Sequence, residues 1–131
     1  MINITRIIRF FFYFSIIIIL ILYLFPGSLI GYFLYDDLRV QPSIISNPLG
    51  TSINHLICFF CLSLLGFLSY IEAPYFKKIF IFLFLMSGIL EILHIIVPKR
   101  SFELLDLIAN ILGVLIIYIL ALIYKKKEKN I

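Results

Sequence analysis

The chain has 131 residues, of which 63% are hydrophobic and only 14% are charged, whereas a soluble domain is close to half apolar and a quarter charged. A water-soluble domain of this length would bury too small a fraction of its surface to hide so much apolar area. The net charge of +4 does not indicate nucleic-acid binding, because the basic residues flank apolar runs, where they set membrane orientation. The composition therefore excludes a soluble globular protein and predicts one membrane domain over residues 1–131.

Four segments have the roughly 20 mostly apolar residues that are needed to cross a bilayer. A proline follows each of the first three segments, and the basic run Lys125-Lys126-Lys127 closes the fourth. The first segment is too long for the core of a signal peptide and lacks a small-residue cleavage site, so we expect it to be retained. The prediction is an all-α, integral membrane four-helix bundle with helices over residues 7–25, 53–70, 79–97 and 104–124.

The distribution of Lys and Arg predicts that both termini face the cytoplasm, because cytoplasmic segments of membrane proteins carry an excess of these residues. In this orientation eight of the 11 basic residues are cytoplasmic, and Arg39, Lys99 and Arg100 are outside. The outer segments are then a loop over residues 26–52 and a short turn over residues 98–103. Residues 28–39 mix aromatics with charges, which is typical either of a segment lying at the bilayer surface or of an aromatic-rich loop anchored there.

Ionisable residues inside membrane spans are costly and tend to be functional, and in this chain they gather near the outer ends of the predicted helices. On the third and fourth segments, three polar or small residues at i, i+4 and i+7 share one helix face. These residues are Ser87, Glu91 and His94 on the third segment, and Asp106, Asn110 and Gly113 on the fourth.

Counting inward from the turn at roughly 1.5 Å per residue places both polar faces roughly 5–10 Å inside the outer boundary, with His94 level with Asp106. His55 begins the second segment at the same depth, and Arg100 in the turn stands above them. We therefore predict a small polar pocket that opens to the outer leaflet and has a cation at its rim. Its expected ligand-binding residues are His55, Glu91, His94, Arg100, Asp106 and Asn110.

Two other interpretations of these residues are structural or metal-related. The polar faces could hold the helices together by hydrogen bonds, with Gly88 and Gly113 allowing close backbone approach. Glu91-x-x-His94 is similar to half of a di-metal motif of helical bundles, but that motif needs carboxylates from other helices and Asp106 alone is available. We therefore expect no metal site and no cofactor. Cys58-x-x-Cys61 lies in an apolar run and is interpreted as two small packing residues.

Residues 88–113 resemble the signature of the VanZ-like membrane protein family, and the resemblance extends over about half of the chain, from His55 onward. In place of the Asp-Lys pair that many members have shortly before this histidine, the chain has Thr51-Ser52, and many members have Gln where it has His94. The matching positions are Gly88, Glu91, His94 as the polar residue three later, Pro98-x-Arg100, Asp106, Asn110 and Gly113.

The family takes its name from a protein associated with low-level resistance to the glycopeptide teicoplanin. The resemblance therefore implies a bacterial cell-envelope protein that acts at the outer face of the cytoplasmic (inner) membrane, with a link to antibiotic resistance among its possible roles. The expected localisation is that membrane, crossed several times by the chain.

Three functions are consistent with these residues. In the first, the outward pocket binds the polar head of a lipid or lipid-linked envelope precursor, and Arg100 engages its phosphate. In the second, the protein is a membrane hydrolase or transferase acting on such a lipid, with Glu91 or Asp106 as general base and His94 as proton shuttle. No hydroxyl nucleophile or recognised catalytic motif stands out, so the sequence leaves open whether the protein is an enzyme.

In the third function, the protein is a structural or accessory subunit whose polar faces dock a membrane partner protein or a second copy of the chain. The expected partners are thus a membrane lipid or lipid-linked precursor and, for the third function, a homo-oligomer or another membrane protein. Nucleic acid is not among them.

Overall fold

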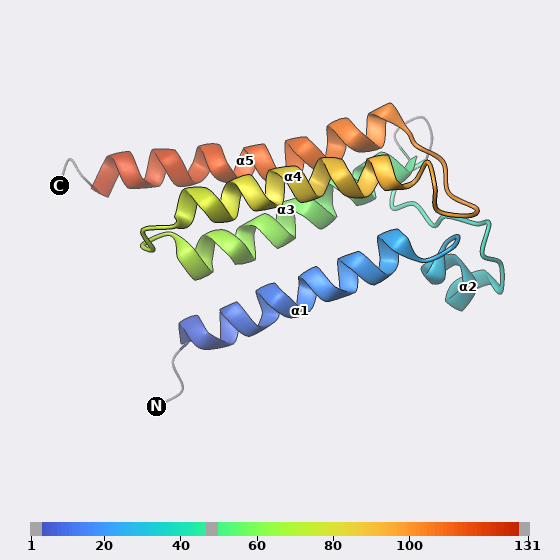
Figure 1. The fold of residues 1–131 in the computed structure, drawn as a ribbon, viewed down its shortest axis with the longest axis horizontal. Helices are drawn as coiled ribbons and strands as arrows, with labels where there is room; N and C mark the ends of the chain where they lie inside the picture. The colour runs from blue at the N-terminus through green and yellow to red at the C-terminus, as the bar shows by residue number, and fades with distance from the viewer. Residues whose placement is uncertain (1–3, 47–49, 129–131) are drawn as a thin grey trace.

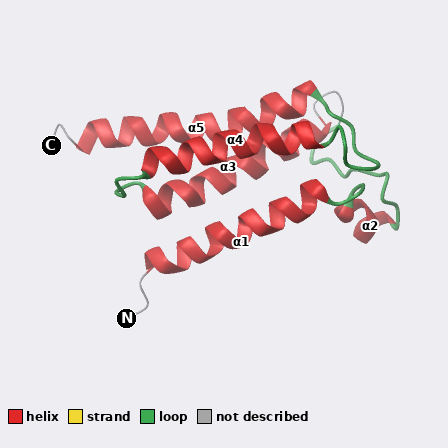
Figure 2. Cartoon of the chain, in the orientation of Figure 1, coloured by secondary structure: helices red, strands yellow, loops and turns green. Residues whose placement is uncertain are grey.

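The computed structural model describes residues 4–46 and 50–128, and within these residues the regular secondary structure consists of helices, without strands. Four of the five helices are long and run alternately in opposite directions, and the short one lies near one end (Figure 1). Loops and turns join them (Figure 2). The helices are α1 (Ile4–Leu24), α2 (Leu29–Tyr35), α3 (Gly50–Tyr70), α4 (Phe76–Leu93) and α5 (Leu104–Glu128).

The two ends of the bundle differ. At one end α1 begins, α5 ends and a short turn joins α3 to α4; at the other lie α2 and the two longer connections (Figure 1). We call the latter the α2 end. It gathers the last turns of α1 and α4 and the first turns of α3 and α5, so residues that are distant in sequence meet there.

Three helices, α1, α3 and α5, are long and apolar enough to cross a membrane. Helix α4 has 18 residues, about 27 Å at 1.5 Å per residue, and includes the charged Lys77, Lys78 and Glu91. Large apolar side chains such as Phe10 (64% exposed) and Ile119 (54%) point away from the bundle, and a soluble protein avoids apolar surface of this extent. The all-α prediction is confirmed, and three candidate spans are supported where four were predicted.

Helix α4 ends at Leu93, earlier than the predicted helix over residues 79–97. Pro98 disfavours helical backbone at Val97, and Lys99 has a φ of 61°, which a helix cannot contain. The amides of the three residues after the helix bond to carbonyls three residues back, forming a tight terminal turn. His94 is therefore the cap of α4, and the connection to α5 is longer than expected.

The predicted loop over residues 26–52 contains a helix, α2, and residues 47–49 of that range lie outside the described residues. Ser28 begins the helix by accepting a hydrogen bond from the Gly31 amide at 2.9 Å, as an N-cap does. Asp36 ends it in the left-handed conformation, with φ of 54°. The structure therefore places a short helix within residues 28–39, and whether this segment lies along the bilayer surface or is an anchored loop stays a prediction.

The apolar core lies between the four long helices, where side chains such as Phe12, Phe59 and Val114 are fully buried. Helices α3 and α5 approach closely at Gly113, where a Cβ would lie 2.6 Å from the carbonyl oxygen of Leu56. Only glycine permits this backbone contact. The close approach holds the first turns of α3 and α5 together, and these turns carry much of the site described next.

Candidate functional site

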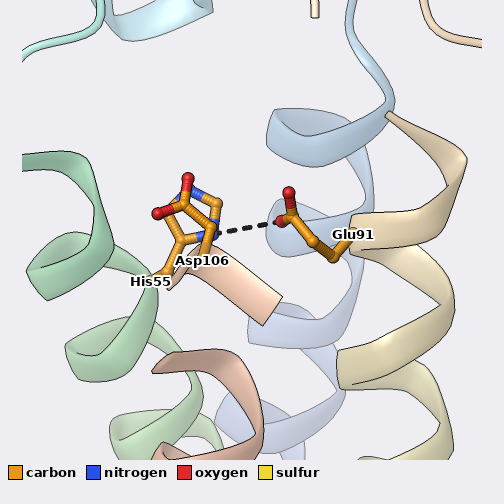
Figure 3. Close-up of side chains that lie close together, drawn as sticks. All are labelled: His55, Glu91 and Asp106. Atoms are coloured by element: carbon orange, nitrogen blue, oxygen red, sulfur yellow. Dashed lines mark ion pairs between the residues drawn. The ribbon is translucent and has the colours of Figure 1, made fainter. Parts of the chain in front are cut away.

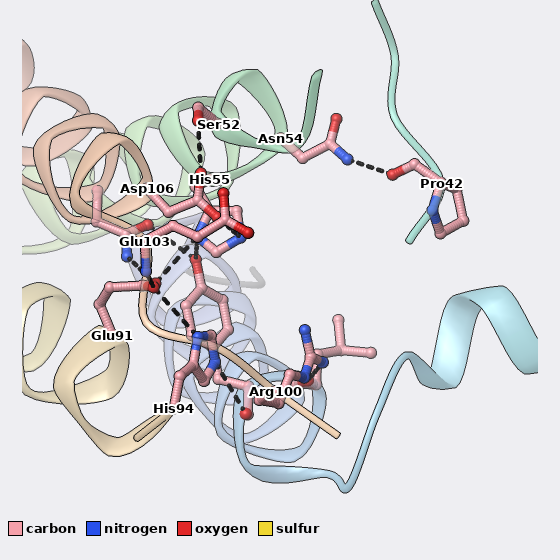
Figure 4. A network of polar contacts seen from close by, with 12 residues as sticks. Pro42, Ser52, Asn54, His55, Glu91, His94, Arg100, Glu103 and Asp106 are labelled. Carbon is pink, nitrogen blue, oxygen red and sulfur yellow. Dashed lines mark hydrogen bonds and ion pairs between the residues drawn. The ribbon is translucent and has the colours of Figure 1, made fainter. Parts of the chain in front are cut away.

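Buried polar side chains from all four long helices meet at the α2 end (Figure 4). Each is 9% exposed or less, and together we call them the polar cluster. Its members are Tyr23 of α1, Ser52 and His55 of α3, Glu91 of α4, His94 at the cap of α4, and Asp106 and Asn110 of α5. Polar groups are rarely buried this completely without partners, so their contacts indicate what the cluster can do.

The imidazole of His55 lies between two carboxylates (Figure 3). Its Nδ1 is 3.5 Å from Oε2 of Glu91, and its Nε2 is 3.4 Å from Oδ2 of Asp106. The other oxygen of Asp106 accepts a hydrogen bond from the Ser52 hydroxyl at 2.5 Å. His55 thus links α3 to both α4 and α5.

Glu91 is fully buried, and its carboxylate contacts two N–H donors and the ring of His94. Oε1 accepts from the backbone amide of Glu103 at 3.2 Å and faces Nδ1 of His94 at 3.3 Å. Oε2 accepts from the side-chain amide of Asn110 at 3.4 Å. A buried carboxylate with this many donors retains its charge at a lower cost than an isolated one.

The hydrogen-bond partners determine which atoms of the cluster carry protons. The amide nitrogen of Asn110 donates to the Ser87 carbonyl and to Glu91, so its oxygen accepts the Tyr23 hydroxyl proton at 2.8 Å. That hydroxyl has no second proton, so Nδ1 of His55 donates to it at 3.0 Å. Nε2 of His55, facing Asp106, is then the nitrogen without a proton when the ring is neutral.

The structure brings together five of the six residues that were predicted to bind a ligand: His55, Glu91, His94, Asp106 and Asn110. His94 leaves its helix and donates from Nε2 to the backbone carbonyl of Tyr23 at 3.2 Å. The sequence analysis missed Tyr23 and Ser52. Tyr23 looked like one more aromatic in an apolar run, although a hydroxyl near the outer end of that run was an available signal.

The sixth residue, Arg100, lies outside the cluster and turns towards α1, where its Nη2 donates to the Leu22 carbonyl at 2.6 Å. Its Nε is buried and has no hydrogen-bond partner among the described residues. Burial lowers the pKa of Arg100 from its ordinary value, but a guanidinium stays charged at neutral pH. Arg100 therefore offers an unsatisfied, positively charged donor.

A pocket of about 110 Å³ lies beside the cluster, which is room for several water molecules or a small polar group. Tyr23 and His55 of the cluster line it, together with Arg100. The remaining wall comes from the last residues of α1, the start of α2, the loop at residues 41–42 and the first turns of α3. The pocket was expected between the polar faces of the third and fourth predicted helices, but Glu91, Asp106 and Asn110 lie behind His55 and do not line it.

The cluster also has the composition of a metal-binding group. His55, Glu91 and Asp106 can each offer one ligand atom, and these atoms lie within 4.8 Å of one another (Figure 3). From sequence we expected no metal site, because a bundle motif would need further carboxylates. The fold supplies the imidazole of His55 between the two carboxylates instead. Cys58, which lines the pocket, and Cys61 are free cysteines of α3 that form no disulfide.

Comparison with curated proteins gives no match, and comparison with solved structures gives none either. The sequence model of the VanZ/LLP1 family matches residues 10–125, which is most of the chain and includes every member of the polar cluster. Together with the three long apolar helices, this match fits a membrane protein. The resemblance inferred from residues 88–113 is confirmed, and the chain belongs to the VanZ/LLP1 family.

Proposed function

We propose that this protein is a cell-envelope membrane protein whose pocket at the α2 end binds the phosphate-bearing head of a lipid or lipid-linked envelope precursor. The observation that carries the proposal is that Arg100 lines a pocket of about 110 Å³ and that its buried Nε has no hydrogen-bond partner among residues 4–46 and 50–128. A buried donor without a partner costs roughly 1–3 kcal/mol, and a phosphate oxygen would satisfy it.

In this proposal α4 crosses the bilayer with the three other long helices, and both termini face the cytoplasm. Lys77 and Lys78 stand in the first turn of α4, from which long basic side chains can reach the membrane surface while the rest of the helix spans. The first residue of α1 and the last of α5 lie at one end of the bundle (Figure 1). The excess of basic residues at that end supports a cytoplasmic location for it, so the α2 end would face outward from a bacterial inner membrane.

The pocket suits the head of a lipid rather than a whole lipid. It has space for a phosphate-sized group, and its other lining residues are partly polar, such as Gln41, Thr51 and Asn54, and partly apolar, such as Leu29 and Ile30. Exposed apolar side chains of α2, such as Phe33 at 77% exposure, would contact acyl or prenyl chains in the surrounding membrane. Arg100 would hold the phosphate, and His55 could donate to a neighbouring oxygen.

Native mass spectrometry of the gently extracted full-length protein tests this function, with phosphatidylglycerol, a polyprenyl phosphate and uncharged diacylglycerol as probes. Wild type should retain a phosphate-bearing lipid and not diacylglycerol. Arg100→Ala should reduce retention about tenfold, which corresponds to the roughly 1.4 kcal/mol at the lower end of a charge-assisted hydrogen bond. Arg100→Lys should restore part of it, because lysine keeps the charge but loses the planar donors.

Arg39→Ala is the matched control, because Arg39 is another arginine at the α2 end but does not line the pocket. Equal retention by Arg100→Ala and Arg39→Ala would refute a head-group site and leave the polar cluster as a structural network within a membrane assembly. A role in teicoplanin resistance belongs to the same proposal, and antibiotic susceptibility of cells with and without the protein measures it.

A second candidate is a membrane hydrolase or transferase acting on the same lipid class. The observation in its favour is that His55 lines the pocket while its two nitrogens face Glu91 and Asp106. An imidazole held between carboxylates can act as a general acid or base. Release of phosphate or a shortened lipid from the probes above would distinguish an enzyme from a binding protein.

A further inference from the structure

We propose that the polar cluster binds one divalent transition-metal ion, of the Zn²⁺ or Mn²⁺ type, through His55, Glu91 and Asp106. This ion site goes beyond the head-group function, and the two can fail independently. Its ligands come from three helices, α3, α4 and α5, and their donor atoms lie within 4.8 Å of one another (Figure 3). One imidazole with two carboxylates is a donor set that such ions accept.

The proton positions make His55 a competent ligand. Its Nδ1 donates to the Tyr23 hydroxyl oxygen at 3.0 Å, because that hydroxyl gives its own proton to Asn110. The lone pair of Nε2 then points at Oδ2 of Asp106, 3.4 Å away. Metal-binding histidines almost always donate their other ring N–H to an oxygen in this way, which fixes the tautomer. Nε2 of His55 and Oδ2 of Asp106 are then two hydrogen-bond acceptors that face each other, and a proton or a metal cation between them would remove their repulsion.

The distances favour an ion over a shared proton as that cation. A charge-assisted N–H···O⁻ hydrogen bond is about 2.7–2.9 Å long, whereas Nε2 of His55 and Oδ2 of Asp106 are 3.4 Å apart. Two ligands at about 2.0–2.2 Å from a tetrahedral Zn²⁺ are roughly 3.4 Å from each other. His55 and Asp106 therefore already have the separation of two ligands of one ion. Glu91 faces the other ring nitrogen, and with the three donor atoms within 4.8 Å of one another its carboxylate would have to move towards the ion to bind it.

The charges of the cluster point to the same conclusion. Glu91 and Asp106 are 0% and 4% exposed, and buried carboxylates need compensating positive charge. Among residues 4–46 and 50–128, the ion-pair partners of these carboxylates are imidazoles alone, since Arg100 bonds to a backbone carbonyl. A divalent cation would neutralise both carboxylates at once. Three protein ligands would leave one position open, as in catalytic zinc sites.

The test uses the full-length protein in detergent, stripped with a chelator and then loaded separately with Zn²⁺, Mn²⁺ or Co²⁺. After desalting, elemental analysis gives the ions bound per chain, and the visible spectrum of the Co²⁺ form reports nitrogen and oxygen ligands in a tetrahedral site. Wild type should bind about one ion per chain. His55→Gln and Asp106→Asn should each weaken binding at least about tenfold, since each removes a ligand.

The matched control is the Cys58→Ser, Cys61→Ser double variant, which removes both cysteines of the chain and with them the competing Cys-x-x-Cys donors. It should bind the ion as wild type does. Uptake lost in this variant but kept in Asp106→Asn would overturn the proposal, as would wild-type protein that takes up none of the three ions. If a ligand variant fails to fold, ion uptake by the wild type still tests the proposal. Asp106→Glu keeps the carboxylate and should therefore retain ion binding.

Arg100→Ala separates the two proposals, because the hydrogen bond of Arg100 goes to the Leu22 carbonyl and to none of the three ligand side chains. It should lose lipid retention and keep the ion. Wild-type protein that takes up the ion but retains no phosphate-bearing lipid would refute the head-group site alone, and wild-type protein that retains the lipid but takes up no ion would refute the ion site alone.

Discussion

Replacing Gly113 with alanine should force α3 and α5 apart, because a Cβ at this position would meet the backbone of α3. It would lie 2.6 Å from the Leu56 carbonyl oxygen, 2.8 Å from the Phe60 amide nitrogen and 3.1 Å from Cβ of Phe59. Backbone atoms cannot rotate out of the way, so the helices must shift. Overpacking of this kind costs about 1–3 kcal/mol, partly offset by the gain of about 1 kcal/mol when alanine replaces glycine in a helix.

Gly88→Ala is the matched control, since the nearest atom to its added Cβ would be Cδ1 of Leu107 at 4.0 Å, an ordinary contact. Both variants gain the same helix propensity, so the difference between their free energies of unfolding isolates the packing cost. We expect Gly113→Ala to be about 1–3 kcal/mol less stable than Gly88→Ala. Far-UV circular dichroism during titration of the micellar protein with sodium dodecyl sulfate measures this difference.

Unfolding of the two variants at the same denaturant fraction would refute the close contact between α3 and α5. A stabilised Gly88→Ala beside a destabilised Gly113→Ala would support it and show that the penalty comes from packing. Because Asn110 is one turn from Gly113 on α5, the same displacement should also lengthen the hydrogen bond from the Tyr23 hydroxyl, now 2.8 Å.

Tyr23→Phe removes the hydroxyl that joins His55 to Asn110. Because two buried polar groups then lose that partner, the free energy of unfolding should fall by about 1–3 kcal/mol. The same denaturant titration measures it, and wild-type stability would contradict the proposed hydrogen-bond network. Asn54→Ala should speed amide hydrogen exchange at Ile44, which donates to the Asn54 side chain at 3.2 Å, while exchange within α5 stays unchanged. Equal exchange in wild type and variant would mean that this side chain does not hold the loop.

Part of the site could be predicted because helix geometry is local. The spacing of Glu91, Asp106 and Asn110 within their segments determined which helix face each occupies, and the short connection between the segments set their relative depth. His55 followed from the same depth argument applied to a neighbouring segment. These residues meet in the structure at the α2 end.

Other features depended on contacts that no local pattern contains. The rotation of α1 about its axis decides that Tyr23 is buried in the bundle, and that rotation depends on how α1 packs against the other helices. Arg100 was expected above the cluster, but the longer connection after α4 carries it to the Leu22 carbonyl. The pocket consequently lies on the α1 and α3 side of His55.

By itself, the sequence determined an all-helical membrane protein, the positions of its long apolar segments and the gathering of its ionisable residues near one end. Segment length and helical periodicity are properties of consecutive residues, so they need no knowledge of the fold. Tertiary structure alone decided that His55 lies between two carboxylates, that Tyr23 fixes its tautomer, and that Arg100 lines the pocket with a nitrogen that has no partner in the described part of the chain. Those features depend on how the helices rotate and pack against one another, and many apolar side chains of similar size would allow several such rotations.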